Sequence, residues 1–288
     1  MLYREAGQFK TSYVADQAMF PIAQDRWFVI LVIAFAFLVV LVLAGFIAAA
    51  VGILFGVPSL RIKGLYLAVA TLAAQFFMDW LFARVKWFTN YSPSGSVSPP
   101  PVELFGWVLD APAEKYVFLL GVLVVFTLIA KNLVRSHIGR EWMAMRDMDV
   151  AAEVIGIRPV YAKLTAFAVS AFFVGVAGAL WGFVHLGSWE PLAFNLTLSL
   201  NLLFMIIIGG MGSLLGCYFG AAFIVALPIV LNQVPAWLGV PISTATASHL
   251  EFMIFGALIV FFLIVEPHGL ARLWAIGKEK LRLWPFPH

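Results

Sequence analysis

Residues 27–60 read WFVILVIAFAFLVVLVLAGFIAAAVGILFGVPSL, a run of 34 residues without Asp, Glu, Lys or Arg. An unpaired charge at the centre of a bilayer costs at least about 2.5 kcal/mol, and a membrane-spanning helix needs roughly 20 apolar residues. The run therefore predicts a helix that crosses a lipid bilayer. The whole chain agrees, since 63% of its 288 residues are hydrophobic and 11% are charged, against about 25% charged in soluble domains. This composition excludes a soluble enzyme.

Further charge-free intervals continue the pattern along the chain. They define seven hydrophobic segments, at 28–57, 64–83, 116–133, 164–186, 194–210, 214–233 and 250–266. We therefore predict an all-α fold, a polytopic membrane helix bundle of about seven segments, within a range of six to eight. The predicted domains are a polar N-terminal segment at 1–26, a transmembrane domain at 27–270 and a basic tail at 271–288. The Ser- and Pro-rich stretch 90–112 is predicted to be a loop outside the bilayer.

The distribution of basic residues predicts the orientation of the spans. The polar interval 131–163 and the tail 271–288 both carry several Lys and Arg residues and are expected in the cytoplasm. Seven crossings then place the N-terminus outside. Two crossings would need about 40 residues, so residues 27–60 are expected to form one helix about 51 Å long, against about 30 Å of hydrocarbon.

Glycine patterns predict two kinds of feature. Small residues spaced by four, which include Gly175, Gly178, Gly182 and Gly216, indicate faces on which two helices approach closely. Such a face fits either static packing or a moving contact in a transport cycle. The run GGMGS at 209–213, with Gly209, Gly210 and Gly212, instead predicts a turn or helix break that joins two spans on the cytoplasmic side.

The sequence lacks the common motifs of catalysis, nucleotide binding and metal binding. The sequence has no GxxxxGK[ST], HExxH or GxSxG pattern, its five histidines have no close ligand spacing, and Cys217 is the only cysteine. We predict no catalytic residues, no metal and no cofactor bound by this chain. A net charge of +3 from 18 basic and 15 acidic residues indicates membrane lipid as a partner and no nucleic acid.

Neutral polar residues within the segments are the candidates for lining a path. The four selected are Thr71, Gln75, Asn195 and Asn201. Asp79 is the candidate for a buried carboxylate, but we favour an ion pair of Asp79 with Arg84 at the membrane surface. The spans thus lack the charged relays of ion-driven pumps.

Residues 139–164 read GREWMAMRDMDVAAEVIGIRPVYAKL and are too polar to enter the bilayer. The spacing of Met145, Met148, Ala152 and Ile155 predicts a short amphipathic helix with these residues on one face. Gly156 is placed to end the helix, and Pro159 stops its continuation. Such a helix either lies on the membrane surface or fits a groove of a partner protein. Because acids and bases alternate on its polar face, we favour the partner.

Five stretches together resemble the LivM-type branched-chain amino acid permease family. VAAEVIG at 150–156 is similar to the EAA-x-x-x-G coupling pattern of ABC importer permeases, and the other four are SLRIKGLYLAVATLA at 59–73, AKLTAFAVSAFFVGVAGALWG at 162–182, IIGGMGSLLG at 207–216 and EPHGL at 266–270. The resemblance covers residues 51–288. It implies a multi-pass permease subunit of the bacterial inner (plasma) membrane, with the transport path in the domain at 27–270.

The resemblance also implies partners and site residues. The expected partners are a second homologous permease, two cytoplasmic ATPase subunits that hold ATP and Mg, and an extracytoplasmic substrate-binding protein. Within the interval 131–163, termed the coupling loop, the residues implied in ATPase coupling are Arg140, Met145, Arg146, Asp147, Asp149, Ala151, Ala152, Glu153 and Gly156.

The substrates implied are branched-chain or related small amphipathic amino acids. Family members have a further N-terminal portion with a run like GYAGQLSLGHAAF, which has no counterpart between residues 26 and 60. We expect that an internal block is absent there. Two alternative functions remain at this stage: an ion-coupled secondary transporter and a truncated, non-transporting membrane subunit.

Overall fold

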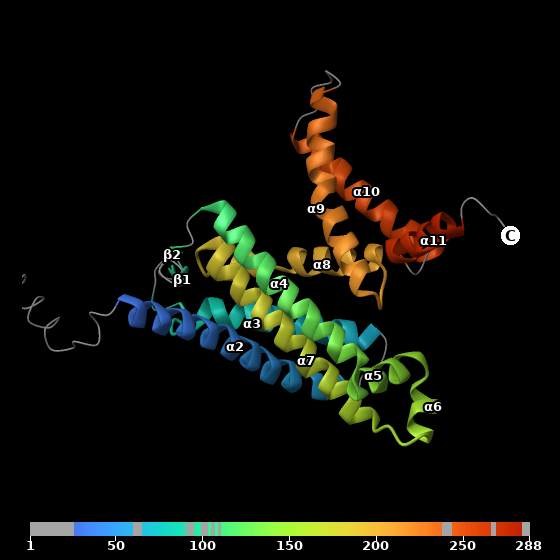
Figure 1. Ribbon diagram of the computed structural model, residues 1–288, viewed down its shortest axis with the longest axis horizontal. Helices are drawn as coiled ribbons and strands as arrows, with labels where there is room; N and C mark the ends of the chain where they lie inside the picture. Colours follow the sequence, from blue (N-terminus) through green and yellow to red (C-terminus); the bar gives the residue numbers. More distant parts are fainter. Residues whose placement is uncertain are drawn as a thin grey trace, which may run out of the picture. The chain divides into compact units, whose positions relative to one another are not determined.

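The computed structural model describes residues 26–59, 65–89, 91, 95–98, 103–104, 107–108, 111–237, 244–265 and 269–283. The chain divides into two compact units, Met1–Pro191 and Leu192–His288. Both units are built almost entirely from helices (Figure 1). The predicted all-α membrane bundle is confirmed.

The described residues of the first unit form six α-helices. These are α2 (Arg26–Ser59), α3 (Leu65–Arg84), α4 (Pro112–Arg135), α5 (His137–Asp147), α6 (Asp149–Val154) and α7 (Pro159–Leu180), and the last continues as a π-helix, η2 (Trp181–Leu186). Residues 27–59 lie within one continuous helix of 34 residues, α2, as predicted. Residues 28–57, 64–83, 116–133 and 164–186, the first four predicted segments, coincide with α2, α3, α4 and α7–η2.

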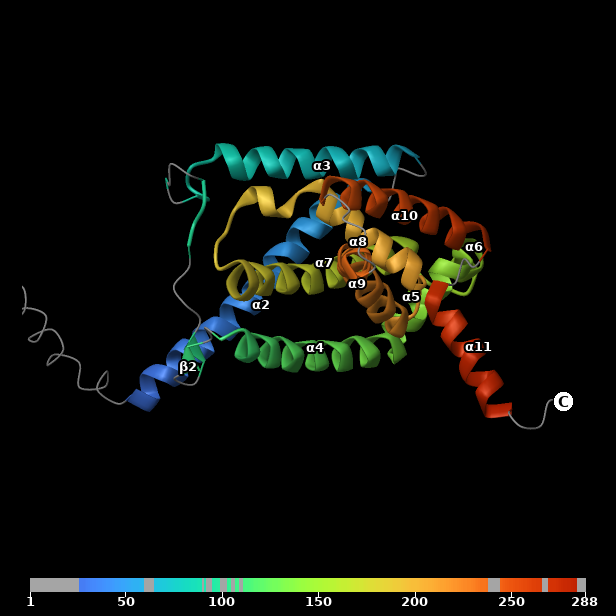
Figure 2. The same cartoon turned by 90° about the horizontal axis from the view of Figure 1, so that it is seen from above.

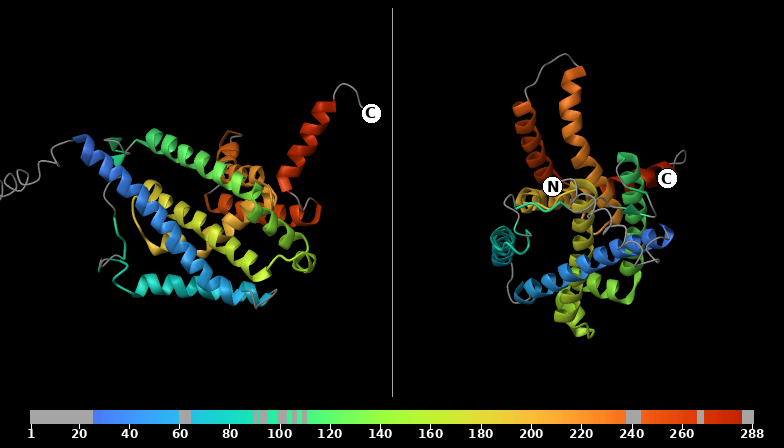
Figure 3. Two further views of the ribbon diagram at one scale, coloured as in Figure 1. Left: turned by 60° about the horizontal axis from the view of Figure 1, so that its bottom comes forward. Right: turned by 90° about the vertical axis from the view of Figure 1, so that its left-hand side faces the viewer.

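Helices α2 and α7 form the main contact of the first unit. They run antiparallel, with Gly45 of α2 against Phe172 of α7 and Gly52 against Ala171 (Figures 1 and 3). A methyl group at Gly52 would lie 2.6 Å from the Cβ of Ala171, and one at Gly175 would meet Ala48. Only glycine at these positions allows the two backbones to come so close. The small-residue faces on α2 and α7 are therefore a helix–helix contact.

The core of this unit lies where α2, α4 and α7 meet. Leu41 of α2 packs with Val176, Leu180 and Val184 of α7–η2, and Phe118 of α4 covers this group. Interdigitated aromatic rings extend the contact, as Phe37 lies 6.1 Å from Phe118 between ring centroids.

The predicted loop 90–112 contains a small addition to the helical fold. Two short antiparallel strands, β1 (Glu103–Leu104) and β2 (Trp107–Val108), pair within it. Val97 also forms an isolated antiparallel bridge with Trp189, whose ring rests on Gly182. The backbone polar groups of these residues are thus paired by hydrogen bonds, although the composition of the stretch indicated only a loop.

The described part of the second unit forms four α-helices after a short 3-10 helix, η3 (Pro191–Phe194). These are α8 (Leu196–Gly209), α9 (Leu214–Trp237), α10 (Thr244–Val265) and α11 (Gly269–Leu283). The predicted segments 194–210, 214–233 and 250–266 coincide with α8, α9 and α10. Ile208, Ile224, Phe255 and Phe262 form the buried core where these three helices pack.

The glycine run between α8 and α9 forms the turn that joins these helices and also allows their close contact. Gly210 and Gly212 have φ values of +114° and +90°, which side chains with a Cβ rarely adopt. Ser213 then caps α9 by accepting a hydrogen bond from the backbone of Gly216 at 3.2 Å. A methyl group at Gly209 would meet the carbonyl of Gly216. The predicted helix break at 209–213 is confirmed.

Four helices of the described residues are long and apolar enough to cross a membrane. They span Phe35–Pro58, Pro112–Arg135, Pro159–Leu186 and Leu214–Leu231, and shorter apolar helices cover Leu196–Gly209 and Met253–Phe262. The chain is therefore a multi-pass membrane protein. The predicted ion pair between Asp79 and Arg84 is wrong, because it is not among the ion pairs of the described residues. A spacing of five places these residues on different faces of α3.

Candidate functional site

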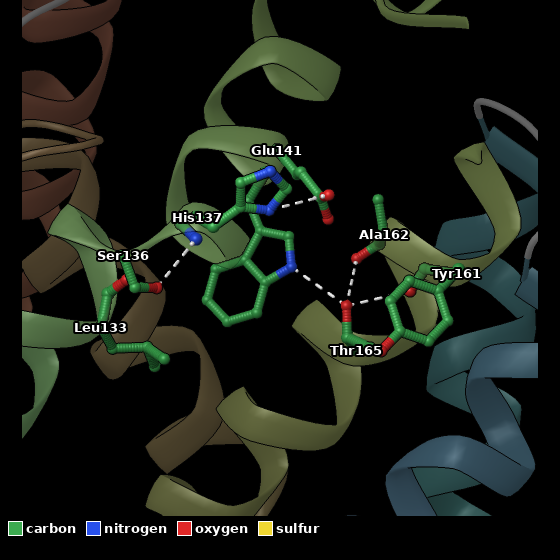
Figure 4. A network of polar contacts seen from close by, with 9 residues as sticks. Leu133, Ser136, His137, Glu141, Tyr161, Ala162 and Thr165 are labelled. Atoms are coloured by element: carbon green, nitrogen blue, oxygen red, sulfur yellow. Dashed lines mark hydrogen bonds and ion pairs between the residues drawn. The ribbon is translucent and has the colours of Figure 1, made fainter. Parts of the chain in front are cut away.

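Helix α5 starts directly where α4 ends, and one serine serves both ends. Ser136 Oγ donates a hydrogen bond to the carbonyl of Leu133 at 2.6 Å and accepts one from the N–H of Gly139 at 3.4 Å (Figure 4). Gly139 is buried against the last turn of α4, where a Cβ would lie 2.5 Å from the Leu133 carbonyl oxygen. The direction of α5 is thus set by a serine cap and a close backbone contact.

A second polar contact ties α5 to α7. The indole N–H of Trp142 donates to the hydroxyl of Thr165 at 3.1 Å. That hydroxyl donates in turn to the backbone carbonyls of Tyr161 and Ala162, at 2.9 and 3.0 Å (Figure 4). Because Thr165 lies in the second turn of α7, this bond connects α5 to the beginning of a candidate membrane span.

The coupling loop contains two helices rather than the single amphipathic helix that the sequence predicted. Helix α5 ends at Asp147, Met148 is extended at φ −151° and ψ 95°, and α6 begins at Asp149. The carboxylate of Asp149 accepts a hydrogen bond from the N–H of Val150 at 2.9 Å. An acid stabilises the start of a helix and opposes its end, so the pair Asp147 and Asp149 favours a break between them.

The break changes which apolar residues are buried. Met145 and Ala152 pack with Ala162 of α7 into a small core, and Ala152 is 0% exposed. In contrast, Met148 is 71% exposed and Ile155 is 74% exposed. The prediction that Met145, Met148, Ala152 and Ile155 lie on one face is wrong, because the extended residue 148 shifts the register of α6 relative to α5 and only Met145 and Ala152 are buried.

Gly156 ends α6 as predicted. Its φ is +93°, its N–H donates to the carbonyl of Glu153, and the N–H of Ile157 reaches back to the carbonyl of Ala152, both at 3.0 Å. This is the Schellman arrangement that a left-handed glycine makes possible. Pro159 then starts α7 in its first turn. The turn from α6 into the span is therefore determined by two residues.

The outer side of α6 carries an exposed apolar patch. The patch consists of Met148, Val150, Val154 and Ile155, of which Val154 is 83% exposed, and we call it the docking surface. Charged side chains border it: Asp147, Asp149 and Glu153 against Arg146, which contacts Asp147 at 2.9 Å in an exposed ion pair. An apolar patch with a charged rim is typical of a protein interface.

The other coupling residues named from the sequence are mostly exposed. Arg140, Arg146, Asp147, Asp149, Ala151 and Glu153 are exposed, and Gly156 lies at the turn. Met145 and Ala152 instead support the patch from below. The coupling residues thus separate into a buried base and an exposed rim.

The four residues predicted for a path fall into two pairs. Thr71 and Gln75 lie one turn apart on α3, in the first unit, whereas Asn195 and Asn201 belong to the second unit. The side chain of Asn195 caps α8 by accepting a hydrogen bond from the N–H of Leu198 at 2.9 Å, so it has a structural role.

The remaining glycines that the sequence singled out lie at positions where they contribute to the helical packing. Gly175, Gly209 and Gly216 lie at helix contacts, and Gly182 faces the ring of Trp189. The carbonyl of Gly178 accepts a hydrogen bond from Trp181 where α7 changes into the π-helix. Within the described residues no group of three or more His, Cys, Asp or Glu side chains is arranged to hold a metal.

Sequence reasoning missed two features. The first is the bond between Trp142 and Thr165; Trp142 precedes Met145 by three residues, and that spacing places both on one face of a helix. The second is α11, described from the sequence only as a basic tail. Its apolar residues Leu270, Leu273, Trp274 and Leu281 recur at helical spacing, which is the signal of an amphipathic helix.

The structure defines a multi-pass helical membrane protein with a helical loop packed against the start of a candidate span, and transporter membrane subunits belong to this class. The chain belongs to the family of branched-chain amino acid transport system permease components, whose family model matches residues 11–263. This membership is consistent with a transport subunit rather than an enzyme.

Individual relatives agree with this assignment. The chain is 31% identical over 251 residues to the high-affinity branched-chain amino acid transport system permease protein LivM of Salmonella typhimurium, which covers 79% of this chain and 56% of the relative. LivM of Escherichia coli is 30% identical over the same shares. The autoinducer 2 import system permease protein LsrC of an Enterobacter species is 28% identical over 66% of this chain and 56% of its own length. The chain thus spans just over half the length of these relatives, and no solved structure matches it.

Proposed function

We propose that this chain is a membrane-spanning subunit of an ABC importer that forms the path for branched-chain or related small amphipathic amino acids. The energy comes from ATP that two cytoplasmic partner subunits bind with Mg and hydrolyse. Family membership supports the importer class over an ion-coupled secondary transporter. In the bacterial inner membrane, the remaining partners are a second homologous permease and an extracytoplasmic binding protein.

The docking surface on α6 is the observation that carries this proposal. Its four apolar side chains are exposed, yet the helix beneath them is held by Ala152 in the buried core and by Gly156 at the turn. A partner that buries this surface gains apolar contact without deforming the loop. Residues 146–154 carry three acids and one base, so the matching groove on the ATPase is expected to be apolar with a basic rim.

The same geometry supplies the mechanical link. Only Ile157 and Arg158 separate Gly156 from the first residue of α7, Pro159, and the contact of Trp142 with Thr165 adds a second connection to that span. Closure of the ATPases would therefore displace the beginning of α7. Because α7 packs closely on α2 through Gly45, Gly52 and Gly175, the displacement would pass to α2 as a rigid movement.

The amino-acid substrate is proposed from the names of relatives. Two of them are branched-chain amino acid permeases, and another imports autoinducer 2. Apolar amino acids fit a path with few charges, since the candidate span Leu214–Leu231 contains no Asp, Glu, Lys or Arg. The sidedness of the path in the importer follows from the cytoplasmic position proposed for α6.

The proposal is tested on the full chain co-expressed with its candidate ATPases, second permease and binding protein and reconstituted in liposomes. We expect ATP-dependent leucine uptake and substrate-stimulated ATP hydrolysis. The double reversal Arg146→Asp with Asp147→Arg should reduce ATPase recruitment, whereas Lys115→Glu at the start of α4 should not. Uptake driven by a proton gradient without ATPases would instead identify a secondary transporter. An assembled complex without stimulated hydrolysis would identify a non-transporting subunit.

A further inference from the structure

Helix α11 has one apolar face and a strongly basic remainder. Leu270, Leu273, Trp274, Gly277 and Leu281 fall on a single face at about 3.6 residues per turn. Lys278 and Lys280 flank this face on its two sides. The helix carries four basic residues, Arg272, Lys278, Lys280 and Arg282, against one acid, Glu279. This arrangement is typical of helices that lie in a membrane interface.

The apolar face of α11 borders an open groove. The groove has a volume of about 710 Å³ and lies between α11 and the first turns of α9, where Phe219 and Phe223 form its opposite wall. The rings of Phe219 and Trp274 are in contact, with centroids 5.5 Å apart. Trp274 and Leu281 nevertheless remain exposed. Among the described residues, Lys278 is the only charged one that lines the groove.

The surroundings of the groove relate it to the end of a membrane span. Helix α9 is a candidate span from Leu214, and the groove lies within two or three turns of that end. Gly269, the first residue of α11, is held against the glycine turn that precedes α9, where a Cβ would lie 2.5 Å from the N of Gly210. Figures 1 and 2 show α11 running crosswise to α9. A helix crosswise to a span, fixed at the end of that span, lies along the membrane surface.

We propose that the groove between α9 and α11 binds an anionic phospholipid, with an acyl chain between Phe219, Phe223 and Trp274 and the phosphate at Lys278, while Lys280 adds positive charge on the other side of the apolar face. The volume is within the range of about 300–1,000 Å³ found for ligand sites. The lining is apolar, as an acyl chain requires, and Lys278 can extend its charged end along its rim to the headgroup. An acidic protein segment would meet the same charges, but it would find almost no hydrogen-bonding groups in the groove.

The test uses the full chain in nanodiscs made either of phosphatidylcholine or of an equal mixture of phosphatidylcholine and phosphatidylglycerol. Native mass spectrometry then measures the lipid that remains bound after transfer to detergent. Gly277→Phe fills the groove, and Gly277→Ala is its control, because a Cβ at this position meets open space. Lys278→Gln with Lys280→Gln removes the headgroup contact and the added positive charge. The single change Lys131→Gln removes a charge from α4 and serves as the control for charge.

The wild-type chain should retain phosphatidylglycerol in preference to phosphatidylcholine. Each lysine removed should weaken this retention about fivefold, and Gly277→Phe should abolish it, while Gly277→Ala and Lys131→Gln behave as wild type. Equal retention of both lipids would overturn the proposal. So would a Gly277→Phe chain that keeps its phosphatidylglycerol. If that variant instead lost a protein partner at unchanged lipid content, the groove would be a protein site. These outcomes do not depend on transport, so they are separate from those that test the importer.

Discussion

Helices α6 and α11 are the two amphipathic elements that expose apolar side chains next to candidate membrane spans, and they differ in both charge and support. Residues 146–154 carry three acids and one base, whereas α11 carries four bases and one acid. Helix α6 rests on the buried core of Met145, Ala152 and Ala162. Helix α11 borders an open groove. An acidic, firmly supported helix suits a protein partner that moves a span, and a basic helix over an open groove suits anionic lipid.

The difference in support explains why similar apolar exposure serves two purposes. Transmission of force requires that the exposed patch cannot move independently of the helix below it, and α6 meets this condition through its buried alanine and its glycine turn. Lipid binding requires only a surface to which a flexible chain can adapt. Changes at the base of α6 should therefore have larger effects than changes at its rim, and α11 should respond mainly to changes of its face and charge.

Ala152→Phe should have the largest effect. Ala152 is 0% exposed, and overpacking of a tight core costs about 1–3 kcal/mol. The added ring should push α6 away from α5 and α7 and remove ATPase recruitment. Trypsin cleavage after Arg146 in the purified chain measures the opening of the loop and should become faster. Ala151→Phe, at the exposed neighbouring position, should leave the cleavage rate unchanged; equal rates in the two variants would contradict a buried base.

Gly156→Val should have the next largest effect. A φ of +93° costs a residue with a Cβ about 1–2 kcal/mol, and a β-branched side chain is the least suited to it. The helix should therefore end differently and misdirect the docking surface, which lowers ATPase recruitment at unchanged membrane insertion. Gly156→Asn is the matched variant, since asparagine tolerates this conformation. Recruitment should return largely to the wild-type level in it, and an equal loss in both would indicate that the turn is not what matters.

Most of the helical fold was predictable because the bilayer imposes a simple rule. Inside a bilayer, the backbone N–H and C=O groups of charge-free runs such as 27–60 and 194–210 need partners within the protein, and a helix supplies them within the run. Helices α2 and α8 therefore begin and end within a few residues of the predicted limits. The turn at Gly210 and Gly212 and the helix end at Gly156 were predictable for a related reason, since glycine is the residue that adopts positive φ freely.

The coupling loop was predicted less well, because its structure depends on contacts distant in sequence. Periodicity placed Met148 and Ile155 on the same face as Met145 and Ala152, yet with the break between Asp147 and Asp149 only the latter two are buried. The position of Ala162, which completes the core from α7, decides which residues are buried. The pattern alone also gave no way to see that Trp142 reaches Thr165, 23 residues further along the chain.

Paired changes at the two surfaces separate their functions. Val150→Ser with Val154→Ser should weaken ATPase binding about tenfold for each side chain that becomes fully buried in the complex, without altering retained phosphatidylglycerol. Leu281→Ser on α11 should reduce the retained phosphatidylglycerol without weakening ATPase binding. All three positions are exposed, so the thermal stability of the chain should change little. Parallel measurements of ATPase co-purification and bound lipid provide the test, and loss of both in one variant would contradict the division between the two helices.

Trp142→Phe should have the smallest effect, because it removes one polar bond and keeps a smaller aromatic ring at this position. The hydrogen bond to Thr165 at 3.1 Å should contribute about 1 kcal/mol, which is about fivefold in the opening of α5 measured by hydrogen exchange. Thr165→Val removes the other partner. If the bond couples α5 to α7, the double variant should open no more than the worse single variant, whereas additive effects would show that each residue acts separately. Hydrogen exchange in α11 should be unchanged in the two single variants and in the double variant. The support of α6 would then rest on a polar link as well as on packing, and that link would lie on the route by which the docking surface moves α7.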